Sequence, residues 1–143
     1  MAIQHEFICI DEGHATLLHI NELDQSKNWL APIGQPAARD MQLIGDGKIL
    51  IGHHHGYSEF DIALGRLVKE FKSLEGVTAV RRQPSGHTII AGVDIAEVVG
   101  QASCLSNFGQ KNDRLEACPT KLKGVVVLEL DKNDTEIHRA IFP

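Results

Sequence analysis

The chain has 143 residues, of which 43% are hydrophobic and 23% charged, and its formal net charge is −5 at pH 7. Because a domain takes roughly 100–200 residues, this length predicts one domain, 1–143, with a core that needs no disulfide framework. The acidic balance argues against nucleic acid as a partner, and no apolar run reaches the ~20 residues of a membrane-spanning helix. The first residues lack the pattern of a secretory signal, so we expect a cytoplasmic protein with no membrane partner.

The predicted elements are short strands separated by turns, and only Glu97–Gln101 could form a turn of helix. The first unit, 5–34, has three strands, which are Glu6–Asp11, Thr16–Asn21 and Trp29–Ile33. The second unit, 38–76, has four, which are Ala38–Ile44, Lys48–His53, Tyr57–Ala63 and Arg66–Ser73. The third unit, 77–143, has an insertion over 95–123, and its strands are Thr78–Gln83, His87–Val93, Val125–Asp131 and Thr135–Ile141.

These units repeat along the chain. An aromatic residue, a glycine and an arginine follow one another at equal intervals, first from Trp29 to Arg39 and again from Phe71 to Arg81. The hairpin turn Asp46–Gly47 recurs as Ser85–Gly86, at a slightly shorter interval. A period of roughly 40 residues with four strands per unit is typical of a β-propeller blade, and a β-sandwich with similar hairpins is the alternative. The fold class predicted is therefore all-β, with about three four-stranded blades, of which the first lacks its first strand.

Three segments carry a family resemblance: GDGKILIG, GYSEFDIALGRLVKEF and GVTAVRRQPSGHTIIAG. They resemble the repeats of PQQ-like and WD40-like bacterial β-propellers, and their pattern of hairpin and turn motifs is similar to that of the arylsulfotransferase type. The resemblance implies blade geometry, and it does not by itself imply a chemistry, because this fold hosts many functions.

The number of blades predicts a partner. Propellers close with about four to eight blades, and three blades leave strand edges and apolar faces open. Either two copies complete a six-bladed ring through head-to-tail contacts, as a homodimer, or the chain is half of a longer polypeptide. Residues 1–4 or a loop would then have to supply the missing strand of the first blade.

Histidines gather at one turn. In propellers of this type, the turn between the second and third strands of a blade lies at the top face, so the resemblance places His53, His54, His55 and Tyr57 there, with His14 on the neighbouring blade. This cluster could bind a ligand, supply a general base from His53 or His55, or hold a metal ion. It could equally be a solvated loop. Adjacent residues of a strand point to opposite sides, so no metal site is assigned.

Arg39 and Arg81 fall at matching positions of the repeat that relates the aromatic, glycine and arginine residues. Two guanidinium groups at a channel mouth could hold a carboxylate, sulfate or phosphate. In the alternative interpretation, each arginine pairs with an acidic residue of the next blade, and Asp40 and Glu75 are nearby in the sequence.

The cysteines and the insertion add less. Cys9 lies in an apolar strand and is expected to be a buried small hydrophobe, and an odd cysteine count favours free thiols at Cys104 and Cys118. The sequence requires no cofactor and has no phosphate-binding or zinc-protease motif. Long insertions are often functional, and the polar candidates of this one are Asn107, Lys111, Asp113 and Arg114.

Three functions follow from these features. The first is a propeller scaffold that binds a small anionic or polar ligand, or a protein partner, at its top face and is completed by self-association. The second is an enzyme on the same fold that acts on a small anionic or carbohydrate-like substrate with a top-face histidine as base. The third is a truncated half of a longer propeller without autonomous activity.

Overall fold

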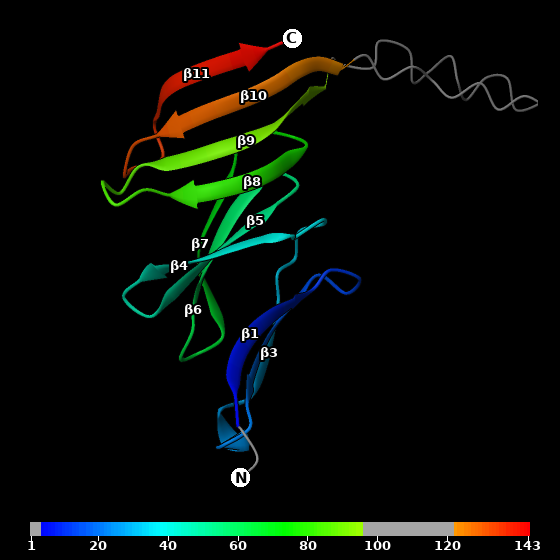
Figure 1. The fold of residues 1–143 in the computed structure, drawn as a ribbon, viewed down its shortest axis with the longest axis vertical. Helices are drawn as coiled ribbons and strands as arrows, with labels where there is room; N and C mark the ends of the chain where they lie inside the picture. Colours follow the sequence, from blue (N-terminus) through cyan, green and yellow to red (C-terminus); the bar gives the residue numbers. More distant parts are fainter. Residues whose placement is uncertain (1–3, 96–121) are drawn as a thin grey trace, which may run out of the picture.

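The computed structural model describes residues 4–95 and 122–143, which form three antiparallel sheets arranged in chain order (Figure 1). The first sheet has three strands in the order β1–β2–β3, and a short 3-10 helix, η1, precedes the last of them. The bounds are β1 Glu6–Asp11, β2 Thr16–Asn21, η1 Gln25–Lys27 and β3 Trp29–Pro32.

The second sheet has four strands in the order β4–β5–β6–β7, which run as a simple meander. Its two central strands are buried along most of their length, because a sheet lies on either side. The bounds are β4 Asp40–Gly45, β5 Lys48–His53, β6 Gly56–Asp61 and β7 Arg66–Lys72.

The third sheet repeats this meander in the order β8–β9–β10–β11. Strands β9 and β10 pair directly, for example Val93 with Val125, although residues 96–121 separate them in the chain. The expected helical turn Glu97–Gln101 lies outside the described residues. The bounds are β8 Val77–Arg82, β9 Thr88–Ile95, β10 Leu122–Leu130 and β11 Glu136–Phe142.

The predicted fold class is confirmed. The chain is all-β, with sheets of three, four and four antiparallel strands, and the incomplete sheet is the first one. The sheets lie one after another like blades, and closure into a ring stays a prediction. In the described part of the chain, η1 has three residues, and no helix is long and apolar enough to cross a membrane.

Two apolar layers hold the three sheets together, one on each side of the second sheet. Ile49 and Ile51 of β5 point toward the first sheet, whereas Leu50 points toward the third, as the alternation of a strand requires. The layer between the first and second sheets contains Leu17, Ala31, Ile33, Ala38, Ile49, Ile51 and Phe60. The layer between the second and third contains Leu50, Tyr57, Val77, Val80, Ile90, Val126, Leu128 and Leu130.

The second and third sheets open with hairpins in the same register. Met41 pairs with Ile51 in the second sheet, and Val80 pairs with Ile90 in the third. Met41 stands as far before Gly47 as Val80 stands before Gly86, so the two residues occupy equivalent positions. This register therefore relates β4 to β8 residue by residue.

Arg39 and Arg81 do not occupy equivalent positions, and the prediction made from their spacing is wrong. Arg39 lies one residue before β4, whereas Arg81 lies inside β8 and pairs with Ile89. The hairpin turns fix which residues face each other, and these turns recur at a shorter interval than the one that separates the two arginines.

The apolar layers predict the effect of a core truncation. The change Ile51→Ala should lower the free energy of unfolding by about 2–5 kcal/mol, because a fully buried side chain leaves a cavity between the first and second sheets. Urea unfolding followed by fluorescence measures the loss. Leu64→Ala is the control, since Leu64 is 60% exposed and should cost only a few tenths of a kcal/mol. Equal losses in the two variants would contradict the assignment of Ile51 to the core.

Candidate functional site

The histidine turn between β5 and β6 is tied to the links on both sides of the second sheet. The backbone N–H of His54 donates to the carbonyl of Pro36, at 3.0 Å, in the link from the first sheet. Its carbonyl accepts from the N–H of Val77, at 3.0 Å, where the third sheet begins. Ser73 donates to the carbonyl of His55 at the same distance. The turn is therefore part of the joint between the sheets, not a free loop.

His53 has a buried side chain. Its Nδ1 accepts a hydrogen bond from the backbone N–H of His55 at 3.3 Å, while Nε2 is buried with no partner in the described chain. Burial lowers the pKa of His53, so its imidazole is neutral with the proton on Nε2. The rings of His54 and His55 lie edge to face at 4.9 Å. His14 belongs to the β1–β2 turn, where its Nδ1 bonds Asp11 at 2.7 Å.

The burial of His53 predicts a stability loss in mild acid. The unfolded chain protonates His53 near pH 6.5 and the folded chain resists, so stability should fall as pH drops below about 6.5. The slope from this one group is at most about 1.4 kcal/mol per pH unit. Urea unfolding of wild type and His53→Gln at pH 7.5, 6.5 and 5.5 measures it. A flatter pH dependence in the variant is expected, and parallel curves would contradict it.

Tyr57 lies in the core between the second and third sheets. The side chain is fully buried, and its ring stacks on Phe71 with the centroids 5.4 Å apart. Its hydroxyl donates to the carboxylate of Asp134, in the turn between β10 and β11. Burial and this hydrogen bond raise the pKa of Tyr57 well above its usual value. Tyr57 therefore joins two sheets, and its ring does not reach a ligand at the surface.

A network of charged side chains surrounds the Tyr57 hydroxyl. Lys69 Nζ lies 2.6 Å from Asp134, and Arg82 Nη2 lies 2.7 Å from Glu59. Both cations lie 5.7 Å from the centre of the Tyr57 ring. The charges balance, with two cations and two carboxylates largely shielded from solvent. Sequence reasoning missed this network, because its members come from four separate segments, β6, β7, β8 and the turn between β10 and β11.

The network predicts a coupling between Tyr57 and Asp134. Tyr57→Phe should lower the free energy of unfolding by about 1.5–3 kcal/mol, because it removes a shielded hydrogen bond to a charged acceptor. Asp134→Ala should cost more, since Lys69 also loses its partner. In a double-mutant cycle the two losses should sum to more than the loss in the double variant. If the loss in the double variant equals the sum of the two single losses, the contact between Tyr57 and Asp134 is contradicted.

The two arginines each pair with an acidic residue of the preceding sheet. Arg39 reaches Glu12 of the β1–β2 turn at 2.6 Å, and Arg81 pairs with Asp40 of β4. Asp40 also accepts the backbone N–H of Val80 at 2.8 Å. The guanidinium groups remain more than half exposed, yet each already has a carboxylate. The pairing alternative is right that each arginine has an acidic partner and that Asp40 is one of them. It is wrong about the direction, because both acids belong to the preceding sheet, and Glu12 is a partner in place of Glu75.

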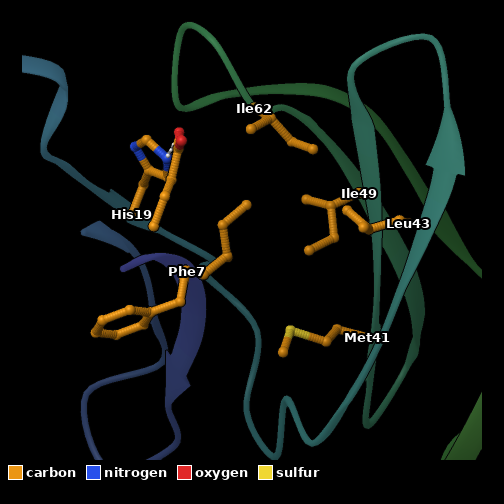
Figure 2. Close-up of a pocket in the computed structure, with 8 residues that line it drawn as sticks. Phe7, His19, Met41, Leu43, Ile49 and Ile62 are labelled. Carbon is orange, nitrogen blue, oxygen red and sulfur yellow. Dashed lines mark hydrogen bonds and ion pairs between the residues drawn. The ribbon is translucent and has the colours of Figure 1, made fainter. Parts of the chain in front are cut away.

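A groove of about 450 Å³ opens between the first and second sheets, beside the free edge of β1 (Figure 2). Figure 2 shows the side chains of Met41, Leu43, Ile49 and Ile62 around this space, while the ring of Phe7 points away from it. Most of the lining is apolar, and the residues are Glu6, Phe7, Ile8, His19, Met41, Leu43, Ile49 and Ile62. The sequence indicated the missing strand here but not the groove.

His19 fixes one wall of this groove. Its Nδ1 bonds the carbonyl of Lys27 at 2.8 Å, and its Nε2 lies 3.0 Å from a carboxylate oxygen of Glu6. The ring also stacks on Trp29 at 5.4 Å. Both ring nitrogens are engaged, so His19 is held as a wall residue and has no free nitrogen to act as a base.

The cysteine predictions are tested only at Cys9. It lies on β1 with a free thiol, and its side chain is half-buried, not buried as expected. Among the described residues, no three His, Cys, Asp or Glu side chains form a group that could hold a metal ion. The remaining candidates lie outside the described residues, namely Cys104, Cys118, Asn107, Lys111, Asp113 and Arg114.

A comparison with known protein families gives no match, and a search of curated proteins finds no similar sequence. The resemblance to PQQ-like and WD40-like propellers therefore stays a prediction.

Proposed function

We propose that the protein is an interaction scaffold of the propeller type and that it associates with a second copy of itself. The support comes from the difference between the second sheet and its two neighbours. Both faces of the second sheet are covered, whereas the first and third sheets each turn one face outward. Apolar side chains line these outward faces, as they line the faces that are covered.

The outward face of the third sheet is carried by β10. Val126 and Leu128 pack toward the second sheet, so the alternate residues Val125 and Val127 face outward. Val125 is 49% exposed and pairs with Phe142, which is 56% exposed. An exposed cluster of this kind on a sheet face is typical of a protein–protein contact.

The outward face of the first sheet has a matching character. Leu17 is buried against the second sheet, so its neighbour Leu18 faces outward, opposite Leu30. Phe7 and Leu30 are 45% and 69% exposed. The two outward faces are different surfaces, one of them the face that meets a preceding sheet and the other the face that meets a following one. Their contact would be head-to-tail, and two such contacts about a twofold axis would close six sheets into a ring.

The arginines favour the scaffold over a small-anion receptor. A carboxylate, sulfate or phosphate at Arg39 or Arg81 would have to displace Glu12 or Asp40, which are already in contact. Removing Asp40 from that pair would also leave the backbone N–H of Val80 without its acceptor. The pairs therefore serve the joints between the sheets.

The proposal predicts a dimer that either open face can disrupt. Native mass spectrometry and light scattering of the full chain should give two copies. Val125→Glu and Leu30→Glu should each give a monomer, because each places a carboxylate on one outward face. Leu64→Glu, at an exposed turn position, should remain a dimer.

Mixing the two monomeric variants sharpens the test. In a head-to-tail ring, the mixture retains one contact between unaltered faces, so a one-to-one complex should form. A wild-type monomer would overturn the proposal. Two variants that stay monomeric when mixed would exclude the head-to-tail arrangement.

A further inference from the structure

The first strand of the second and third sheets, β4 and β8, is here called the inner strand. Among the described residues the first sheet has no such strand, and the groove lies at that position. In the second and third sheets, an inner strand pairs with the next one along the chain, β4 with β5 and β8 with β9. In the first sheet, β1 occupies the position of β5 and β9. One edge of β1 pairs with β2, and among residues 4–95 and 122–143 no strand pairs with its other edge. A row of backbone groups on an open edge is a template for another strand.

Strand β4 shows the consequence of this open position. Val80 of β8 is 1% exposed, because the second sheet covers it, whereas its equivalent Met41 is 43% exposed. Leu43, two residues further along β4, is 70% exposed, although its equivalent Arg82 is largely buried. Both exposed side chains line the groove. An inner strand in the first sheet would lie along the backbone of Met41 and Leu43, as β4 lies along the backbone of Val80 and Arg82. The side chains of Val80 and Arg82 themselves pack on Gly52 of β5 and Glu59 of β6.

The joint between β4 and β8 shows how such a strand is held. Asp40 accepts the backbone N–H of Val80 at 2.8 Å. The Gln42 side chain accepts the N–H of Arg82 at 2.8 Å and donates to its carbonyl at 3.0 Å. Ile44, two positions further, packs into the apolar layer. Side chains at alternate positions of one inner strand therefore bind the backbone of the next.

We propose that the groove binds an extended segment of a protein partner, which adds to β1 as the fourth strand of the first sheet. The segment would carry hydrogen-bonding side chains at two alternate positions, placed like Asp40 and Gln42 and facing the backbone of Met41 and Leu43. An apolar residue placed like Ile44 would follow. This is strand addition to an open sheet edge, in which backbone bonds give affinity and alternate side chains give specificity.

Two observations favour a partner segment as the occupant. All eleven strands of the described residues already belong to a sheet, so a second copy has no spare strand among them. The groove also continues the apolar layer between the first and second sheets, because Ile8, Ile49 and Ile62 belong to both. Apart from Phe7, the residues that line the groove do not belong to the two outward faces, and the proposal goes beyond self-association.

The experiment uses the chain's own inner strand as a probe. A fluorescent synthetic peptide with the sequence of residues 38–46 is titrated into the full-length protein, and its anisotropy is measured. Saturable binding is expected. A matched peptide with alanine in place of Asp40 and Gln42 should bind at least tenfold more weakly. Amide chemical shifts should change in β1 and β4 when the first peptide is added, and those of β10 and β11 should stay unchanged.

Protein variants locate the site. Leu43→Glu should weaken peptide binding at least tenfold, whereas Leu64→Glu, also at an exposed leucine, should bind like wild type. Val125→Glu should bind the peptide fully even if it is monomeric, which separates this proposal from self-association. The midpoint of urea unfolding should be the same for Leu43→Glu and wild type.

Three results would overturn the proposal. The first is no saturable binding up to about 1 mM peptide, and the second is equal binding of the alanine peptide. The third is a lowered unfolding midpoint for Leu43→Glu in the absence of peptide, which would mean that the protein's own chain already covers the groove.

Discussion

Burial of both faces of the second sheet is the constraint on which the rest of the structure depends. A strand that is covered on both sides must carry apolar residues at consecutive positions, and Ile49, Leu50 and Ile51 provide them. Each face then needs its own apolar layer, so a sheet must lie on either side. Each outer sheet has only one covered face, so burial alternates along its strands, as it does along β2. The open faces at the two ends of the stack follow directly from this arrangement.

Polar contacts link the first sheet to the second and the second sheet to the third. They lie at equivalent positions of the sheets, but different chemical groups make them. Trp29 of β3 donates through its ring N–H to the carbonyl of Ile62, at 2.9 Å, in the turn that ends β6. Lys69 holds the equivalent place on β7 and reaches Asp134 in the corresponding turn of the third sheet. One joint thus uses an indole and a backbone carbonyl, and the other an ion pair. The geometry is the same at both joints because the last strand of each sheet meets the same turn of the next.

Local sequence patterns predicted the strands well. The bounds of Glu6–Asp11, Thr16–Asn21 and Lys48–His53 are the same in the sequence prediction and in the structure, because turns and alternation are local signals. Contacts between sheets are not local. Tyr57 follows three histidines and reads as a surface residue, yet its partner Asp134 lies 77 positions away. The same limit explains why the sequence did not indicate that Arg82 is buried. Its burial depends on Glu59 of another sheet, whereas the sequence pattern pointed to its exposed neighbour Arg81.

The outward face of the third sheet carries a polar pair where the second sheet has its charged joint. Glu129 stands in the place of Glu59, and the strand pairing sets His138 opposite it, in the place of Lys69. His87 already lies 2.8 Å from Glu129, so the carboxylate is engaged before any contact forms. An isolated carboxylate on an apolar face would oppose its burial, whereas a paired one can be covered at smaller cost. The face therefore combines apolar side chains with a polar group that is already satisfied, as the covered faces do.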